Sequence, residues 1–164
     1  MIINNAGINE IHAVGELNEV DYDNMIAVNL TAPYLITNGF INKMVEREYG
    51  RIVNIASIWS IVSKPGRGVY SSAKRGLHGL TTTLATEYAI KNILTNTVSP
   101  GFTLTDLTRK NNTTDEINAI SKLIPIGRMA EVNEIANAVY FLASRENTYI
   151  NGQNLVVDGG FSLL

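Results

Sequence analysis

Tyr70 and Lys74 stand four residues apart in a stretch that we expect to be helical, so their side chains project from the same helix face. A tyrosine with its ordinary pKa of about 10 exchanges protons poorly near neutral pH. An ammonium group beside the phenol stabilises the phenolate and lowers that pKa, at about 1.4 kcal/mol of differential interaction for each pKa unit. The pair could therefore act as general acid-base machinery, although the same spacing arises by chance in many helices.

Ser57 supports this interpretation of Tyr70. It follows an expected buried strand and stands 13 positions before Tyr70. Open α/β sheets place their ligands at the carboxyl ends of strands. A hydroxyl there can hold a carbonyl oxygen while Tyr70 gives that oxygen a proton. The alternative is that Ser57 only caps or turns the chain after the strand.

Alternating strands and helices must position these side chains. Runs rich in β-branched and other apolar residues predict strands, at 1–3, 51–56, 93–98 and 154–157. Apolar residues at three- and four-residue spacings predict helices, at 23–45, 70–90, 116–124 and 133–143. This alternation predicts an α/β fold, a parallel sheet with helices on both faces, in a single domain. The polar segment 105–115 is expected to be a mobile flap.

The composition excludes several classes of function. The chain has 164 residues, 45% of them hydrophobic, and a net charge of −2, so we predict neither nucleic-acid binding nor membrane adsorption. It has no cysteine, which excludes disulfides, thiol catalysis and thiolate metal sites, and we predict no metal site. No apolar run approaches the roughly 18 residues of a membrane span. We therefore expect a cytoplasmic protein.

Six motifs in order along the chain resemble those of the short-chain dehydrogenase/reductase family. They are Asn4-Asn5-Ala6-Gly7, Val28-Asn29-Leu30, Ile52-Val53-Asn54-Ile55-Ala56-Ser57, Tyr70-Ser71-Ser72-Ala73-Lys74, Ser99-Pro100-Gly101 and Val157-Asp158-Gly159-Gly160. The tail, with Ile124-Pro125-Ile126-Gly127-Arg128 and Ile150-Asn151-Gly152-Gln153, is similar to the 3-oxoacyl-carrier-protein reductase-like branch. The resemblance implies the C-terminal part of a Rossmann-type doubly wound sheet whose first three strands are missing.

The resemblance also implies roles for particular residues. Tyr70 would be the catalytic acid-base and Ser57 would polarise the substrate carbonyl or hydroxyl. Lys74 would hold the nicotinamide ribose and tune Tyr70, while Asn29 would position a water that passes protons to Lys74. The alternative for Asn29 is a helical asparagine that bonds its own backbone. The cofactor, NAD or NADP, would also contact Asn4, Ala6, Gly7, Pro100, Gly101, Thr103 and Thr105.

Three features depart from the family pattern. The Thr-Gly-x-x-x-Gly-x-Gly loop is absent, and Gly66-Arg67-Gly68 does not replace it because it follows no strand and lacks a third glycine. Trp59 and Ser60 stand where small residues and glycine are usual, which suggests an altered substrate mouth. Lys64, Arg67, Arg109 and Lys110 could face an anionic substrate, although an ordinary solvated surface is the alternative.

Two hypotheses about function follow. The first is an oxidoreductase that moves a hydride between NAD(P) and a carbonyl or secondary-alcohol substrate. The second is a catalytically silent fragment or dimerising binding module, which is expected to bind a dinucleotide poorly. In either case the resemblance implies a homodimer or homotetramer assembled through helices 23–45 and 70–90.

Overall fold

The computed structural model describes residues 1–164 and contains one four-stranded parallel sheet in the order β1-β2-β3-β4. Its strands are β1 (Ile2–Asn4), β2 (Gly50–Ile55), β3 (Ile93–Pro100) and β4 (Asn154–Val157). Ile2 pairs with Ile52, Ile52 with Thr95, and Thr97 with Asn154. The carboxyl ends of all four strands therefore meet at one edge of the sheet. The predicted α/β class is confirmed.

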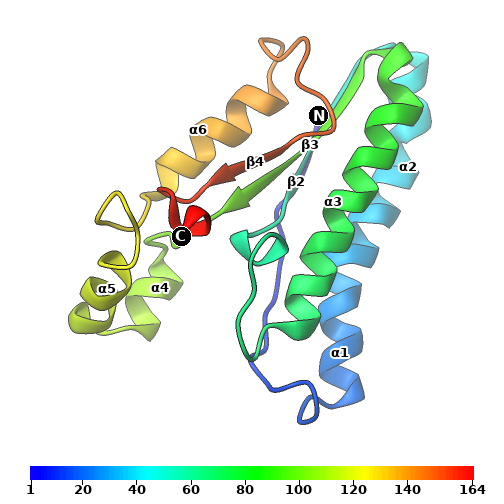
Figure 1. Cartoon of the computed structure of the whole chain (residues 1–164). Coiled ribbons are helices and arrows are strands. Elements are labelled where there is room, and N and C mark those ends of the chain that lie inside the picture. The colour runs from blue at the N-terminus through cyan, green and yellow to red at the C-terminus, as the bar shows by residue number, and fades with distance from the viewer.

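Helices cover both faces of this sheet (Figure 1). One face carries α1 (Glu19–Ile26), α2 (Ala32–Glu46) and α3 (Gly68–Tyr88), and the other carries α6 (Val132–Ala143). Neighbouring residues of β2 point to opposite faces. Ile52 packs with Met44 of α2, whereas Val53 packs with Leu142 of α6. The strands are apolar along their length because both faces are buried.

The first long helix begins four residues earlier than the pattern predicted, at Glu19. Asn18 caps it, since its side-chain oxygen accepts a hydrogen bond from the Asp21 amide at 2.9 Å. In the first turn Val20 and Tyr22 alternate with the acidic Glu19 and Asp21, which is not a helical spacing, and this is why the pattern missed it. Between α1 and α2 the chain forms a π-helical turn over Ala27–Thr31.

The segment expected to be a flap is largely helical. It contains α4 (Asp106–Asn111) and the start of α5 (Thr114–Ser121). Thr105 caps α4 and Thr113 caps α5 in a capping box with Glu116. These two threonine caps begin helices in a segment whose polar composition had indicated a loop. No helix of the chain is both long and apolar enough to cross a membrane.

Candidate active site

The structure brings Ser57, Tyr70 and Lys74 together at the carboxyl edge of the sheet. Ser57 follows β2, where its side chain accepts a hydrogen bond from the Trp59 amide. Tyr70 and Lys74 lie in the first two turns of α3, and the Lys74 Nζ is 5.7 Å from the centroid of the Tyr70 ring. The Ser57 side chain also lies close enough to Tyr70 to favour a lower pKa of its phenol. Ser57 therefore both caps the short turn that follows β2 and contacts Tyr70.

Burial raises the pKa of Tyr70, contrary to the expectation that Lys74 lowers it. The nearby Ser57 side chain and the charge of Arg67 oppose this increase. Lys74 donates a hydrogen bond to the Ile55 carbonyl at 2.8 Å, and burial lowers its own pKa to about 8. The same desolvation thus lowers the pKa of Lys74 and raises that of Tyr70. The charge that opposes the rise in the Tyr70 pKa is that of Arg67.

The low pKa of Lys74 predicts a pH-dependent cost to stability. Because the unfolded chain keeps the ordinary pKa of 10.5, it binds more protons than the folded chain between pH 8 and 10.5, and stability rises with pH there. In urea unfolding, the unfolding free energy of the native chain relative to Lys74→Met should rise by about 2 kcal/mol from pH 7 to pH 9.5. Lys110→Met, at an exposed position, is the control. A difference that stays constant with pH would show that the site accommodates the Lys74 charge without cost.

Asn29 is fully buried inside the π-helical turn. Its amide nitrogen donates to the Ile8 and Met25 carbonyls at 2.8 and 2.9 Å, so it bonds its own helix and also holds the loop after β1. A Cβ at Gly7 would lie 3.0 Å from the Asn29 Oδ1 and 3.3 Å from the Lys74 Nζ. Asn29 and Lys74 therefore flank the same glycine, and a side chain there would displace one of them. Irregular π turns of this kind are frequent at functional sites.

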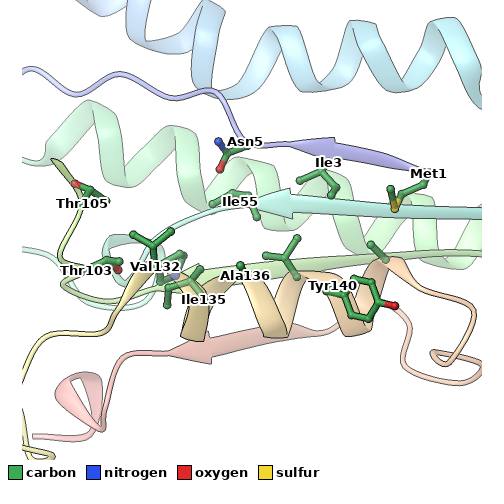
Figure 2. A pocket seen from close by; sticks show the side chains of 13 residues that line it. Met1, Ile3, Asn5, Ile55, Thr103, Thr105, Val132, Ile135, Ala136 and Tyr140 are labelled. Carbon is green, nitrogen blue, oxygen red and sulfur yellow. The ribbon is translucent and has the colours of Figure 1, made fainter. Parts of the chain in front are cut away.

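A cavity of about 570 Å³ lies between the strands of the sheet and α6 (Figure 2). Ile55, whose carbonyl binds Lys74, lines it together with Pro100, Thr103 and Thr105. Its remaining walls come from β1, the residues directly before and after it, and α6: Met1, Ile3, Asn5, Val132, Ile135, Ala136, Val139, Tyr140 and Ala143. The size and the mostly apolar lining are typical of small-molecule sites.

Of the residues expected to contact the cofactor, only Pro100, Thr103 and Thr105 line this cavity, and Asn4, Ala6, Gly7, Tyr70, Lys74 and Gly101 do not. The Asn4 side chain is buried in the sheet and donates to the Asn54 Oδ1 at 2.7 Å, and Asn5 points toward the cavity instead (Figure 2). Gly101 packs against the turn after β4, because a Cβ there would lie 2.7 Å from the Asp158 Cα. Asn4 and Gly101 therefore make structural contacts at the carboxyl edge of the sheet.

Comparison with known proteins identifies the family. Residues 1–162 match the family described as enoyl-(acyl carrier protein) reductase. The 3-oxoacyl-(acyl-carrier-protein) reductase of Rickettsia bellii is 40% identical over 164 residues, which are 100% of this chain and 68% of that one. The chain belongs to the short-chain dehydrogenase/reductase family.

Solved structures of this short-chain dehydrogenase/reductase fold match closely. A putative 2-deoxy-D-gluconate 3-dehydrogenase of Agrobacterium tumefaciens with bound NADP superposes with a TM-score of 0.92 and 36% identity, over 99% of this chain and 68% of that one. A gluconate 5-dehydrogenase of Burkholderia cenocepacia in complex with NADP and tartrate gives a TM-score of 0.93 and 30% identity, over 99% and 65%. The chain spans about two thirds of the length of these relatives. The four strands are thus part of a Rossmann-type sheet.

The residues present fit one end of a nicotinamide dinucleotide. The cavity has an apolar wall and the two threonines Thr103 and Thr105, and Lys74 hydrogen-bonds to the carbonyl of Ile55, one of its lining residues. Gly7 leaves open the space between Asn29 and Lys74. For the pyrophosphate the 164 residues contain no glycine-rich loop, and such a loop with its helix normally supplies the N–H donors for that group.

Two features of the short-chain dehydrogenase/reductase site escaped the sequence analysis. Asn5 was quoted within a motif but not proposed as a site residue, although its place directly after β1 could have indicated the sheet edge. A buried chain of hydrogen bonds also joins Asn4 to Asn54, Asn54 to Thr81 and Thr81 to Thr97. No spacing along the sequence reveals that chain, because its members lie on different elements.

Proposed function

We propose that this protein is an NAD(P)-dependent oxidoreductase that interconverts a carbonyl compound and a secondary alcohol, with Tyr70 as the acid-base. The observation that carries the proposal is the convergence of Ser57, Tyr70 and Lys74 at the carboxyl end of β2, where Lys74 binds the Ile55 carbonyl. A nicotinamide cofactor supplies or accepts the hydride in such a reaction. The relatives' enzymatic names and the NADP bound to two of them support this assignment.

In the direction of reduction, Ser57 holds the substrate oxygen and Tyr70 gives it a proton. The raised pKa of Tyr70 keeps its phenol protonated at neutral pH, so the proton is available to give, and efficient transfer requires a bound ligand to bring that pKa closer to neutrality. Lys74 binds the nicotinamide ribose hydroxyls and returns a proton to Tyr70. Asn29 fixes the loop after β1 against Lys74, and a water near its Oδ1 continues the proton path. In the direction of oxidation the same groups act in reverse.

The residues that would hold the cofactor divide between two segments. Thr103, Thr105 and Pro100, after β3, would contact the nicotinamide and its phosphate. Asn5, Ala6 and Gly7, after β1, would lie along the adenosine side. The choice between NAD and NADP is not made by these residues, so both cofactors belong in the assay.

The test is an assay of reduced-cofactor consumption. We define the extended chain as these 164 residues preceded by the first three strand-helix units of a short-chain dehydrogenase/reductase, including the glycine-rich loop. The extended chain should oxidise NADPH or NADH, followed at 340 nm, only when a carbonyl substrate is added. A properly folded extended chain that consumes neither cofactor with any of a panel of 3-oxo esters, oxo acids and keto sugars would remove the proposal.

Homo-oligomeric assembly is a further part of the proposal, since α2 leaves large apolar side chains in solvent. Tyr34, Leu35, Ile36 and Phe40 are each about half exposed, and α2 lies beside α3 on the outer face (Figure 1). A two-fold pairing of these helices would cover them. Light scattering should therefore give at least twice the 17.9 kDa of one chain, and Tyr34→Glu should shift the chain toward monomer. A well-folded native monomer at micromolar concentration would contradict the pairing.

A further inference from the structure

Arg67 is a cation beside the proposed catalytic tyrosine that has no partner within the protein. It caps α3, three positions before Tyr70. It takes part in none of the chain's three ion pairs, and its Nε is buried without a hydrogen-bond partner. Burial lowers the pKa of Arg67, and the charge of Tyr70 opposes that decrease, so the two side chains act on one another electrostatically. The two Nη groups of Arg67 also make no hydrogen bond within the chain and are not among its buried unpartnered atoms, so they are the donors that an acceptor on a ligand could meet.

An aromatic wall holds Arg67 in place. Trp59 is buried and makes edge-to-face contacts with Phe102 and Phe161, with ring centroids 6.1 and 6.3 Å away. The Arg67 guanidinium carbon is 5.6 Å from the centroid of the Trp59 ring, and the Lys64 Nζ is 5.3 Å from it. Both cations therefore lie near the same Trp59 ring, which is close to Ser57 and attracts them. Trp59, which departs from the family pattern, is therefore the residue beside which these two positive charges lie.

We propose that Arg67, assisted by Lys64, binds the carboxylate of the substrate, so that the protein acts on small hydroxy or oxo acids. This inference rests on the proposed function, since Ser57 and Tyr70 must hold the reacting oxygen of the same molecule. A guanidinium presents paired N–H donors that match a carboxylate. The other predicted cation, Arg109, already faces Glu131 at 3.7 Å. A solvated surface explains Lys64, but it does not explain a guanidinium whose Nε is shielded from water.

The experiment is a calorimetric titration of the 164-residue chain with tartrate, beside threitol, which has the same carbon skeleton with alcohols in place of the carboxylates. Trp59 is the only tryptophan, so a change in tryptophan fluorescence during the titration locates binding at this wall. Tartrate should bind saturably and change the fluorescence, and threitol should do neither. Arg67→Gln should weaken tartrate binding about 10-fold to 100-fold, and Arg67→Lys, which keeps the charge but not the paired donors, should give an intermediate loss.

Arg145→Gln is the matched control, because Arg145 also lies over an aromatic ring, 5.0 Å from the centroid of Tyr49, but not beside Ser57 or Tyr70. It should leave tartrate affinity within about twofold, the range expected when no contact to the ligand is lost. The proposal is overturned if native chain shows no saturable tartrate response, if threitol binds as well, or if Arg67→Lys and Arg67→Gln both bind like native chain. None of these readouts needs cofactor or turnover, so they fail independently of the proposed reduction.

Discussion

Replacing Tyr70 by Phe in the extended chain should lower kcat/KM for carbonyl reduction by about 10²-fold to 10⁴-fold, the range that general acid-base catalysis contributes. The substitution removes one oxygen from a side chain whose ring stays packed beside Lys74. It therefore deletes the proton donor and leaves the ring, the helix and the cavity in place. Cofactor affinity should change little.

Tyr88→Phe is the control for this variant, since Tyr88 ends the same helix and packs against the core cluster of Ile41 and Ile93. It makes the same chemical change far from the sheet edge, and kcat/KM should remain near that of the native chain. If both variants are folded and kcat/KM of Tyr70→Phe lies within tenfold of the native value, another group donates the proton.

The 164-residue chain should bind NADPH or NADH at least about 100-fold more weakly than the extended chain, because two or more charge-assisted hydrogen bonds to the pyrophosphate are lost. The nicotinamide end keeps Lys74, Thr103 and Thr105. A ligand held only at that end lacks the remote contacts that position its reactive carbon, so turnover should fall as well. Calorimetric titration of both chains with each cofactor gives the ratio.

Micromolar affinity and carbonyl reduction by the 164-residue chain would contradict this expectation. The pyrophosphate would then be held by other donors, and residues 63–68 would have to be considered again as a phosphate-binding loop. The Lys74→Met substitution tests the contacts at the nicotinamide end separately from those at the pyrophosphate. This substitution should weaken cofactor binding in the extended chain and remove most of the residual binding in the 164-residue chain, where the nicotinamide end is the only end that is held.

The sequence was sufficient for the fold because its strands are apolar on both faces and its helices keep three- and four-residue spacings. Ile52 and Val53 illustrate this, since each packs under helices on a different face. Helix boundaries were less predictable. Asn18 and Thr105 begin helices through single side-chain caps, in stretches whose composition indicates loops.

The candidate site was predictable where its residues follow strand ends and poorly predictable where it depends on burial. Ser57, Tyr70 and Lys74 were found from spacing and motif. The direction of the Tyr70 pKa was not, because desolvation depends on the whole surrounding structure. The same holds for Arg67, whose buried Nε distinguishes it from an ordinary surface cation only in three dimensions.

Isotope transfer tests the central claim most directly. The extended chain is given NADPH or NADH carrying deuterium at the transferring position of the nicotinamide, with a carbonyl substrate that it turns over. We expect the deuterium on the carbinol carbon of the product, with one label per alcohol formed, and we expect labelled alcohol to form about 10²-fold to 10⁴-fold more slowly when Tyr70 is replaced by Phe. Alcohol formed without deuterium at that carbon, or labelled alcohol formed at the native rate by the Tyr70→Phe variant, would contradict hydride transfer assisted by Tyr70.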